Sequence, residues 1–224
     1  MTGFLVRDDF TGAAATIPVD GERSPETQVG VSFAAMFAFG YGGDMESEGL
    51  RVDGSGHLID SGGSASRAVI GMVISEVPET NILEISLRIK LTTPSSPFSG
   101  VPLTVYKDGD PTFVDLWAFD GERWFHSVSG AEGDVTTSLA FASDADGYTD
   151  IVITFAPGTM TVTSGVGAAT CPSGLTSPWS GDLMVRFDTH LSGWSTIDSL
   201  QVRSLDADGP SAFWTAFVGS YEVP

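Results

Sequence analysis

Three carboxylates stand at alternate positions in the stretch DMESE, where Asp44, Glu46 and Glu48 would share one face of a strand. Retaining glycosidases cleave a glycosidic bond with two carboxyl groups about 5–5.5 Å apart. The residues on both sides of this stretch are glycines, so it lacks the apolar, aromatic surroundings that raise the pKa of a catalytic acid. We therefore interpret it as a solvated acidic loop and predict that the protein is not an enzyme.

A second acidic cluster has the form D-x-D-G-x-x-D, with carboxylates at Asp144, Asp146 and Asp150. Calcium loops gather oxygen ligands from alternate carboxylates beside a glycine, but the glutamate that completes an EF-hand is missing here. A plain hairpin loop is the favoured interpretation, and a calcium site is the weaker alternative. The histidine spacing fits no metal site, and the phosphate-loop, dinucleotide and G-x-S-x-G motifs do not occur, so no cofactor is predicted.

The tryptophans are the remaining candidates for ligand contact, because an indole face can stack on a sugar ring as in lectins. We predict Trp179 and Trp124 as carbohydrate-binding residues. Trp179 lies in the Gly-, Ser- and Thr-rich segment 165–180, which we expect to be the longest loop, and we expect this side chain to be exposed. The alternative is packing inside the protein, where most tryptophans are largely buried.

The elements that must position these residues are strands. Leu83–Leu91, LEISLRIKL, alternates apolar and polar residues, which predicts a strand with Leu83, Ile85, Leu87, Ile89 and Leu91 facing the core. Gly193–Leu205 alternates in the same way and reads as the closing strand. Along the whole chain, about a dozen short strands recur every 8–12 residues, with turns such as 77–81, and the helical signal is weak. This pattern predicts an all-β fold of two antiparallel sheets packed as a sandwich.

Motifs near both ends of this predicted sandwich resemble the concanavalin A-like, or laminin G-like, jelly roll. The late strand reads W-x-x-I-D-x-L-x-V from Trp194 to Val202, and the early strand ends in D-D-F-x-G at residues 8–12. Within this group the chain is most similar to modules of bacteriophage virion proteins, which often carry D-x-F followed by G-R-x-P-D. Here that second stretch reads GERSPE, with Glu22 inserted and Glu26 in place of the aspartate.

The resemblance covers the span from Phe4 to Leu205 and implies a non-enzymatic virion structural protein displayed on a tail, tail fibre or capsid surface. Its expected partners are other virion proteins and host-surface glycans, and its expected location is the virion after synthesis in the host cytoplasm. Two alternatives stay open: a capsid decoration protein that stabilises the shell without binding sugar, and a jelly-roll glycan hydrolase. The fold hosts many functions and does not choose among them.

Length and charge narrow these possibilities. A chain of 224 residues predicts one sandwich domain, residues 1–205, followed by a tail at 206–224. With 29 acidic and 10 basic residues, the net charge of −19 argues against nucleic acid or an anionic membrane as a partner. We expect no signal peptide, because MTGFLVRDDF lacks a basic region followed by an apolar stretch, and no apolar stretch is long enough to cross a membrane. Its one cysteine, Cys171, is expected to be an unpaired loop thiol.

The tail begins with a turn-rich break and then concentrates aromatic residues, namely Phe213, Trp214, Phe217 and Tyr221. Exposed apolar patches on soluble proteins are small and usually functional, so these side chains need a surface to cover them. We predict that they form a partner-binding segment that packs against a neighbouring subunit of a homo-oligomer or another virion protein, with Trp214 as anchor. Docking of the tail on its own sandwich is the alternative.

Overall fold

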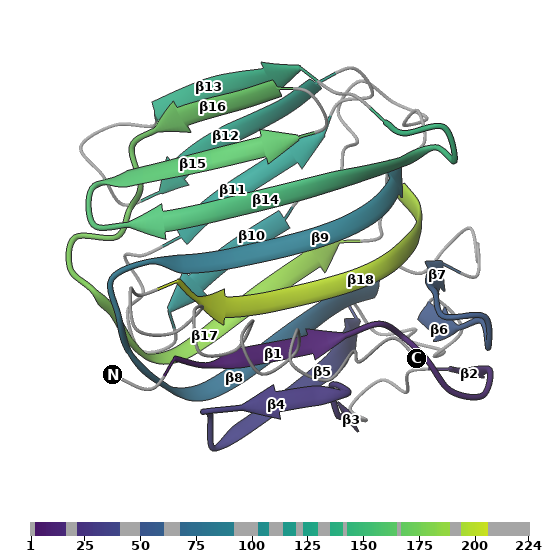
Figure 1. Cartoon of the computed structure of the whole chain (residues 1–224). Coiled ribbons are helices and arrows are strands. Elements are labelled where there is room, and N and C mark those ends of the chain that lie inside the picture. Colours follow the sequence, from purple (N-terminus) through teal and green to yellow (C-terminus); the bar gives the residue numbers. More distant parts are fainter. Residues whose placement is uncertain are drawn as a thin grey trace, which may run out of the picture.

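The computed structural model describes residues 3–16, 22–40, 50–60, 68–91, 103–107, 114–119, 123–129, 135–140, 143–164, 167–188 and 194–205. These residues form eighteen strands in two antiparallel sheets, one in front of the other in Figure 1. The described ranges contain no helix, and therefore no helix of a length and hydropathy that would span a membrane. The predicted all-β sandwich is confirmed.

Sheet A has ten strands, in the order β16-β15-β14-β9-β18-β7-β6-β2, with β1 paired to β18 and β4 paired to β1. Their bounds are β1 Leu5–Asp8, β2 Ala15–Thr16, β4 Thr27–Val29, β6 Leu50–Val52, β7 Leu58–Asp60, β9 Leu83–Leu91, β14 Tyr148–Ala156, β15 Thr159–Ser164, β16 Gly167–Cys171 and β18 Trp194–Ser204.

Sheet B has eight strands, in the order β13-β12-β11-β10-β17-β8-β5-β3. Their bounds are β3 Glu22–Arg23, β5 Phe33–Gly40, β8 Ala68–Thr80, β10 Leu103–Lys107, β11 Val114–Phe119, β12 Arg123–Ser129, β13 Val135–Ala140 and β17 Trp179–Asp188. The two sheets meet along one side, where β13 and β16 lie next to each other (Figure 1).

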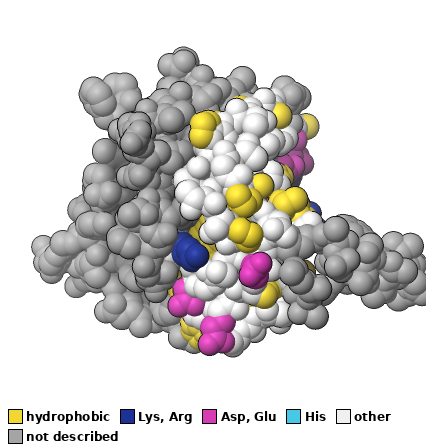
Figure 2. All heavy atoms as spheres, turned by 90° about the vertical axis from the view of Figure 1, so that its left-hand side faces the viewer, with side chains coloured by type: hydrophobic (Ala, Val, Ile, Leu, Met, Phe, Trp, Pro, Cys, Tyr) yellow, Lys and Arg dark blue, Asp and Glu magenta, His cyan; other side chains and the backbone are white. Residues whose placement is uncertain are grey.

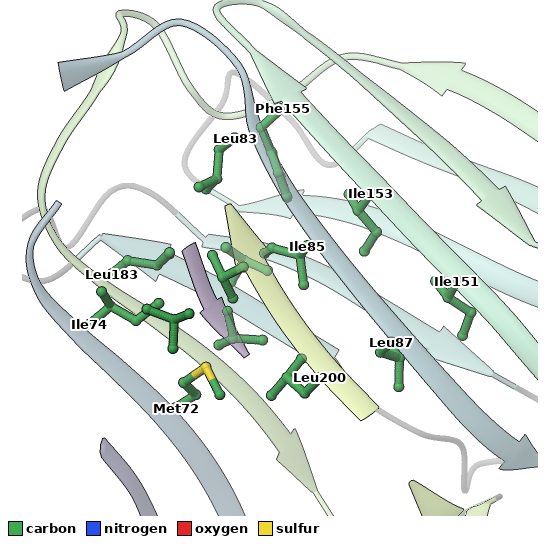
Figure 3. Packing of buried hydrophobic residues seen from close by; sticks show 14 of the residues in the cluster. Met72, Ile74, Leu83, Ile85, Leu87, Ile151, Ile153, Phe155, Leu183 and Leu200 are labelled. Atoms are coloured by element: carbon green, nitrogen blue, oxygen red, sulfur yellow. The ribbon is translucent and has the colours of Figure 1, made fainter. Parts of the chain in front are cut away.

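Strand β9 shows how the alternation of the sequence becomes a core. Leu83, Ile85, Leu87 and Ile89 are each at most 3% exposed, as predicted for the inward set; the side chain of its fifth member, Leu91, lies outside the described part of the structure. They face buried side chains of sheet B, including Met72 and Ile74 of β8 and Leu183 of β17, which are drawn together with residues of β14 and β18 in Figure 3. The opposite set of β9 carries Glu84, Ser86, Arg88 and Lys90 on the outer face of sheet A.

The predicted closing strand is confirmed as β18, with Leu200 and Val202 buried. It lies between β9 and the N-terminal strand β1, so strands from both ends of the described chain pair directly (Figure 1). The ladder between β18 and β9 shifts register between Ile197 and Ser199, which leaves Asp198 as an extra residue in a β-bulge. This bulge matters for the candidate site, because it contributes the Asp198 carboxylate to it.

Two predictions of local structure are wrong. The turn expected at 77–81 belongs to β8, which continues to Thr80 before the chain reverses at Asn81-Ile82. The ladder to β17 shifts register around Gly181 and Val77, and this irregular pairing accommodates Pro78, which has no N–H to donate. The loop expected at 165–180 contains β16, which pairs with β15, so Cys171 is not a loop thiol but a buried strand residue, 6% exposed.

The D-D-F-x-G motif at residues 8–12 and the GERSPE stretch at residues 21–26 pack against each other. The buried Asp8 carboxylate accepts hydrogen bonds from Arg23 Nε and Nη2, both at 2.8 Å, and from the Phe10 N–H at 2.8 Å. Glu26 Oε1 accepts from the N–H and the hydroxyl of Thr11 at 2.5 and 2.6 Å. Phe10 is buried at a φ of +54°, and Arg23 lies 5.8 Å from its ring centre. We call this network the N-terminal clasp.

Figure 2 views the side of the sandwich that lies on the left in Figure 1 and shows hydrophobic side chains in small groups separated by polar surface. Within the described residues, the most exposed large hydrophobic residues are Val29, Phe33 and Ile82, at 39%, 39% and 37%. Each of the three therefore keeps more than half of its surface covered.

Candidate functional site

Several predicted site residues lie outside the described residues, and their roles stay predictions. They are the acidic loop Asp44, Glu46 and Glu48 and the tail aromatics Phe213, Trp214, Phe217 and Tyr221. The backbone of Trp124 lies in β12, paired with Phe119 of β11 and Leu139 of β13, but its side chain is likewise outside the described part.

Trp179 is placed differently from the prediction. It is the first residue of β17, pairs with Thr80 of β8, and is 0% exposed. It is among the largest fully buried side chains and belongs to the hydrophobic core cluster. A buried indole offers no face to a sugar, so the expectation of an exposed Trp179 is wrong and the alternative, a packing anchor, is correct.

The acidic stretch at 144–150 forms the turn that leads into β14, and Arg88 of β9 engages two of its carboxylates. Asp144 Oδ1 accepts from the N–H groups of Asp146 and Tyr148, both at 2.9 Å. Asp144 Oδ2 lies 2.6 Å from Arg88 Nη2, and both oxygens of Asp150 lie 3.2 Å from Arg88 Nη1. The hydrogen bond from Arg88 is the main reason why the pKa of Asp144 lies below its usual value.

Arg88 therefore stands where a cation between these carboxylates would stand. Its Nε is also 3.3 Å from Asp198 Oδ2, so one guanidinium contacts three carboxylates. Among the described residues, no group of three or more His, Cys, Asp or Glu side chains is arranged to hold a metal ion. A guanidinium in this position competes directly with calcium for the same oxygens, so the geometry supports the turn interpretation rather than the calcium alternative.

His57 extends this cluster toward the β6–β7 hairpin. Its Nδ1 is 2.9 Å from Asp53 Oδ2, and its Nε2 is 3.7 Å from Asp198 Oδ1. The hydrogen bond with His57 is the largest cause of the lowered pKa of Asp53. The Tyr148 ring completes the cluster: the Arg88 guanidinium lies 4.8 Å and Lys90 Nζ 5.6 Å from its centre, with the His57 ring stacked at 6.5 Å.

Next to this cluster, a shallow groove of about 190 Å³ opens on the outer face of sheet A. It crosses the four neighbouring strands β1, β18, β9 and β14, whose ladders place Arg7 opposite Gln201, Gln201 opposite Ser86, and Arg88 opposite Asp150. Among the described residues, the lining is Arg7, Ser86, Leu87, Arg88, Asp150, Ile151, Val152, Ser199 and Gln201. The surface is hollow here because the short side chains of Ser86 and Ser199 lie between longer ones.

Sequence reasoning did not find this groove. The alternation of apolar and polar residues in β9 indicated that Ser86 and Arg88 face away from the core, and this could be predicted from the local sequence alone. Nothing local indicated that β9 lies between β14 and β18, or that β1 from the other end of the chain completes the surface. The groove is a property of strand order, because its lining residues come from four segments that are far apart in sequence.

No protein-family model matches the chain, and no curated protein matches its sequence. Solved structures do share its fold. One is the CBM2 module of the evolved Dit of Lactobacillus casei BL23 phage J-1, with a TM-score of 0.56 and 13% identity over 93% of this chain and 99% of that one. Another is Rv0315, an immunostimulatory antigen and pseudo β-1,3-glucanase of Mycobacterium tuberculosis, with a TM-score of 0.56 and 10% identity over 90% and 98%.

A third similar structure is the exoplasmic/lumenal domain of VIP36 in its Ca²⁺-bound form, with a TM-score of 0.52 and 10% identity over 87% of this chain and 91% of that one. Identities this low show the fold alone. The sandwich is therefore a concanavalin A-like jelly roll, as the end motifs predicted, and proteins with different activities share it.

Proposed function

We propose that the chain is a non-enzymatic structural module of a bacteriophage virion, displayed on a tail, tail fibre or capsid surface, where it contacts host-surface glycans. The observation that carries this proposal is the structural likeness to a carbohydrate-binding module of a phage protein, which extends over nearly the full length of both chains. The virion motifs at residues 8–12 and 21–26, which meet in the N-terminal clasp, support the same origin.

Glycan contact is supported by the outer face of sheet A, which presents hydroxyl, amide, carboxylate and guanidinium groups around a groove. The decisive experiment applies the purified, labelled chain to an array of bacterial surface polysaccharides. Retention on at least one polysaccharide, reversed by the same polysaccharide in solution, is the expected result. If nothing on the array retains the chain, the glycan-binding part of the proposal fails and a capsid decoration role replaces it. Immunogold labelling of phage particles tests the virion location independently.

The absence of catalysis is part of the same proposal. A glycosidase needs a carboxylic acid whose pKa is raised so that it keeps its proton near neutral pH. In the described cluster, hydrogen bonds from Arg88 and His57 instead lower the pKa of Asp144 and of Asp53. The purified chain should release no reducing ends from β-glucans or from a polysaccharide that it binds. Activity that disappears in Glu46→Gln or Glu48→Gln would establish the hydrolase alternative.

We further propose that the tail mediates assembly with virion partners or with further copies of the chain. The support is the concentration of four aromatic residues after Pro210, beyond the last described strand, β18. Truncation after Pro210 should leave the melting temperature nearly unchanged and should abolish oligomerisation, measured by light scattering, or incorporation into particles. A truncated chain that unfolds, or one that assembles normally, would contradict this assignment.

A further inference from the structure

The charges around the groove are not those of an anion-binding site. On the three neighbouring strands β1, β18 and β9, this face of sheet A carries four Lys and Arg residues, namely Arg7, Arg88, Lys90 and Arg203. Each of the three arginines is engaged by carboxylates: Arg7 by Asp9 at 2.8 Å, Arg203 by Glu84 at 2.6 Å, and Arg88 by three aspartates.

The guanidinium groups of Arg7 and Arg88 line the groove and are engaged by four carboxylates: Asp150 lines the groove, and Asp9, Asp144 and Asp198 lie beside it. The local balance is negative, and the net charge of the whole chain is −19. A ligand carrying carboxylate or phosphate groups would meet like charge here, at close range and at long range. The charge of this face therefore disfavours the binding of an acidic glycan.

The same groove offers both donors and acceptors of hydrogen bonds. Gln201 contributes an amide, Ser86 and Ser199 contribute hydroxyls, and Asp150 contributes carboxylate oxygens. Neighbouring strands are about 4.8 Å apart, and alternate residues on one strand are about 7 Å apart. Polar groups on such a grid are spread over roughly the width of one pyranose ring, so they can reach hydroxyl groups on different sides of it. Val152, also in the lining, adds an apolar contact.

We propose that this groove binds one residue of a neutral polysaccharide, a hexopyranose without carboxylate or phosphate groups. The inference rests on the proposed glycan-binding function and names both its site and its ligand class. The hollow at Ser86 and Ser199 receives the ring, and Gln201 and Asp150 bind hydroxyl groups at its edge. A volume of about 190 Å³ is below the roughly 300–1,000 Å³ of typical ligand pockets, so the site holds a single sugar unit.

The experiment measures binding by calorimetry to neutral and to acidic polysaccharides drawn from the same array, with three variants of the full chain. Gln201→Ala removes the amide and should weaken binding by about tenfold, the loss of one well-placed hydrogen bond. Ser86→Leu fills the hollow and should abolish binding. Thr163→Ala is the matched control, because Thr163 is exposed on β15 of the same sheet and lies outside the groove. Melting temperatures show whether each variant is folded.

The outcomes separate the inference from the function on which it rests. Preference for neutral polysaccharides, with loss of binding in the two groove variants and full binding in Thr163→Ala, is the expected result. A preference for acidic polysaccharides, or unchanged binding in Gln201→Ala and Ser86→Leu, overturns the inference while glycan binding stands. No binding to any polysaccharide refutes the proposed function itself. If Ser86→Leu does not fold, the partly exposed Gln201 position alone decides the test.

Discussion

Replacement of Asp8 by alanine tests the N-terminal clasp, and its effect can be worked out from the structure. The Asp8 side chain is 0% exposed, whereas its partner Arg23 keeps 22% of its side-chain surface exposed. Removing one member of a buried ion pair costs about 3–5 kcal/mol, because the other charge is left without compensation. Here the cost is reduced by the partial exposure of Arg23 and by Glu26, which stays 3.3 Å from it.

Asp8→Ala also removes the acceptor of the Phe10 N–H, which holds a buried aromatic residue at positive φ. Leaving this buried N–H without an acceptor costs about 1–3 kcal/mol. This cost adds to the loss of the ion pair. We expect the free energy of unfolding to fall by about 3 kcal/mol. For a domain of this size, that loss corresponds to a melting temperature lower by about 6–12 °C.

Urea denaturation of Asp8→Ala, Arg23→Ala and the double variant measures the effect and its origin. The double variant should be destabilised by clearly less than the sum of the two single variants, because both remove the same interaction. Asp9→Ala is the control: its partner Arg7 is 47% exposed, and such surface pairs contribute about 0–1 kcal/mol. A loss below about 1 kcal/mol in Asp8→Ala, or additive single effects, would refute the reasoning.

Three further predictions concern the core, acid and calcium. Leu87→Ala should cost about 2–5 kcal/mol of unfolding free energy in urea denaturation, because Leu87 is 3% exposed between the sheets; a loss under about 0.5 kcal/mol would place it outside the core. Stability should decrease with acid. Burial raises the pKa of Glu26, but hydrogen bonds from Thr11 and from the Asp9 N–H, together with the charge of Arg23, outweigh this and leave it below 4.5; the hydrogen bond from Arg88 lowers the pKa of Asp144 below 3.8. The stabilisation from these two carboxylates is complete at a pH above their ordinary pKa values and is lost as the pH falls through their lowered pKa values. A melting temperature that increases when the pH is lowered from about 5 to about 3 would contradict this prediction. Millimolar calcium should leave the melting temperature unchanged, because Arg88 engages the carboxylates of the 144–150 turn; an increase that is lost in Asp144→Asn would establish a calcium site.

Much of the fold could be predicted from the sequence, because the patterns that indicate strands and turns lie within short segments of the chain. In β9 and β18 the side chains alternate between core and surface, so the period of two in the sequence indicates both the strand and its buried face. The turn at 144–147 was also predictable, because Asp144 binds the N–H groups two and four residues further along its own backbone. Such patterns need no knowledge of the partner strand.

Other features could be seen only in the tertiary structure, because they depend on which strands become neighbours. Trp179 is buried because β17 pairs with β8, and β16 exists because β15 offers an edge to a Gly- and Thr-rich segment with no strong pattern of its own. Arg88 belongs to the cluster only because β14 and the bulge of β18 lie on either side of β9. Strand order and register are set by the whole hydrophobic core at once, so the sequence determined which side chains face outward, and the assembled sheet decided which of them meet.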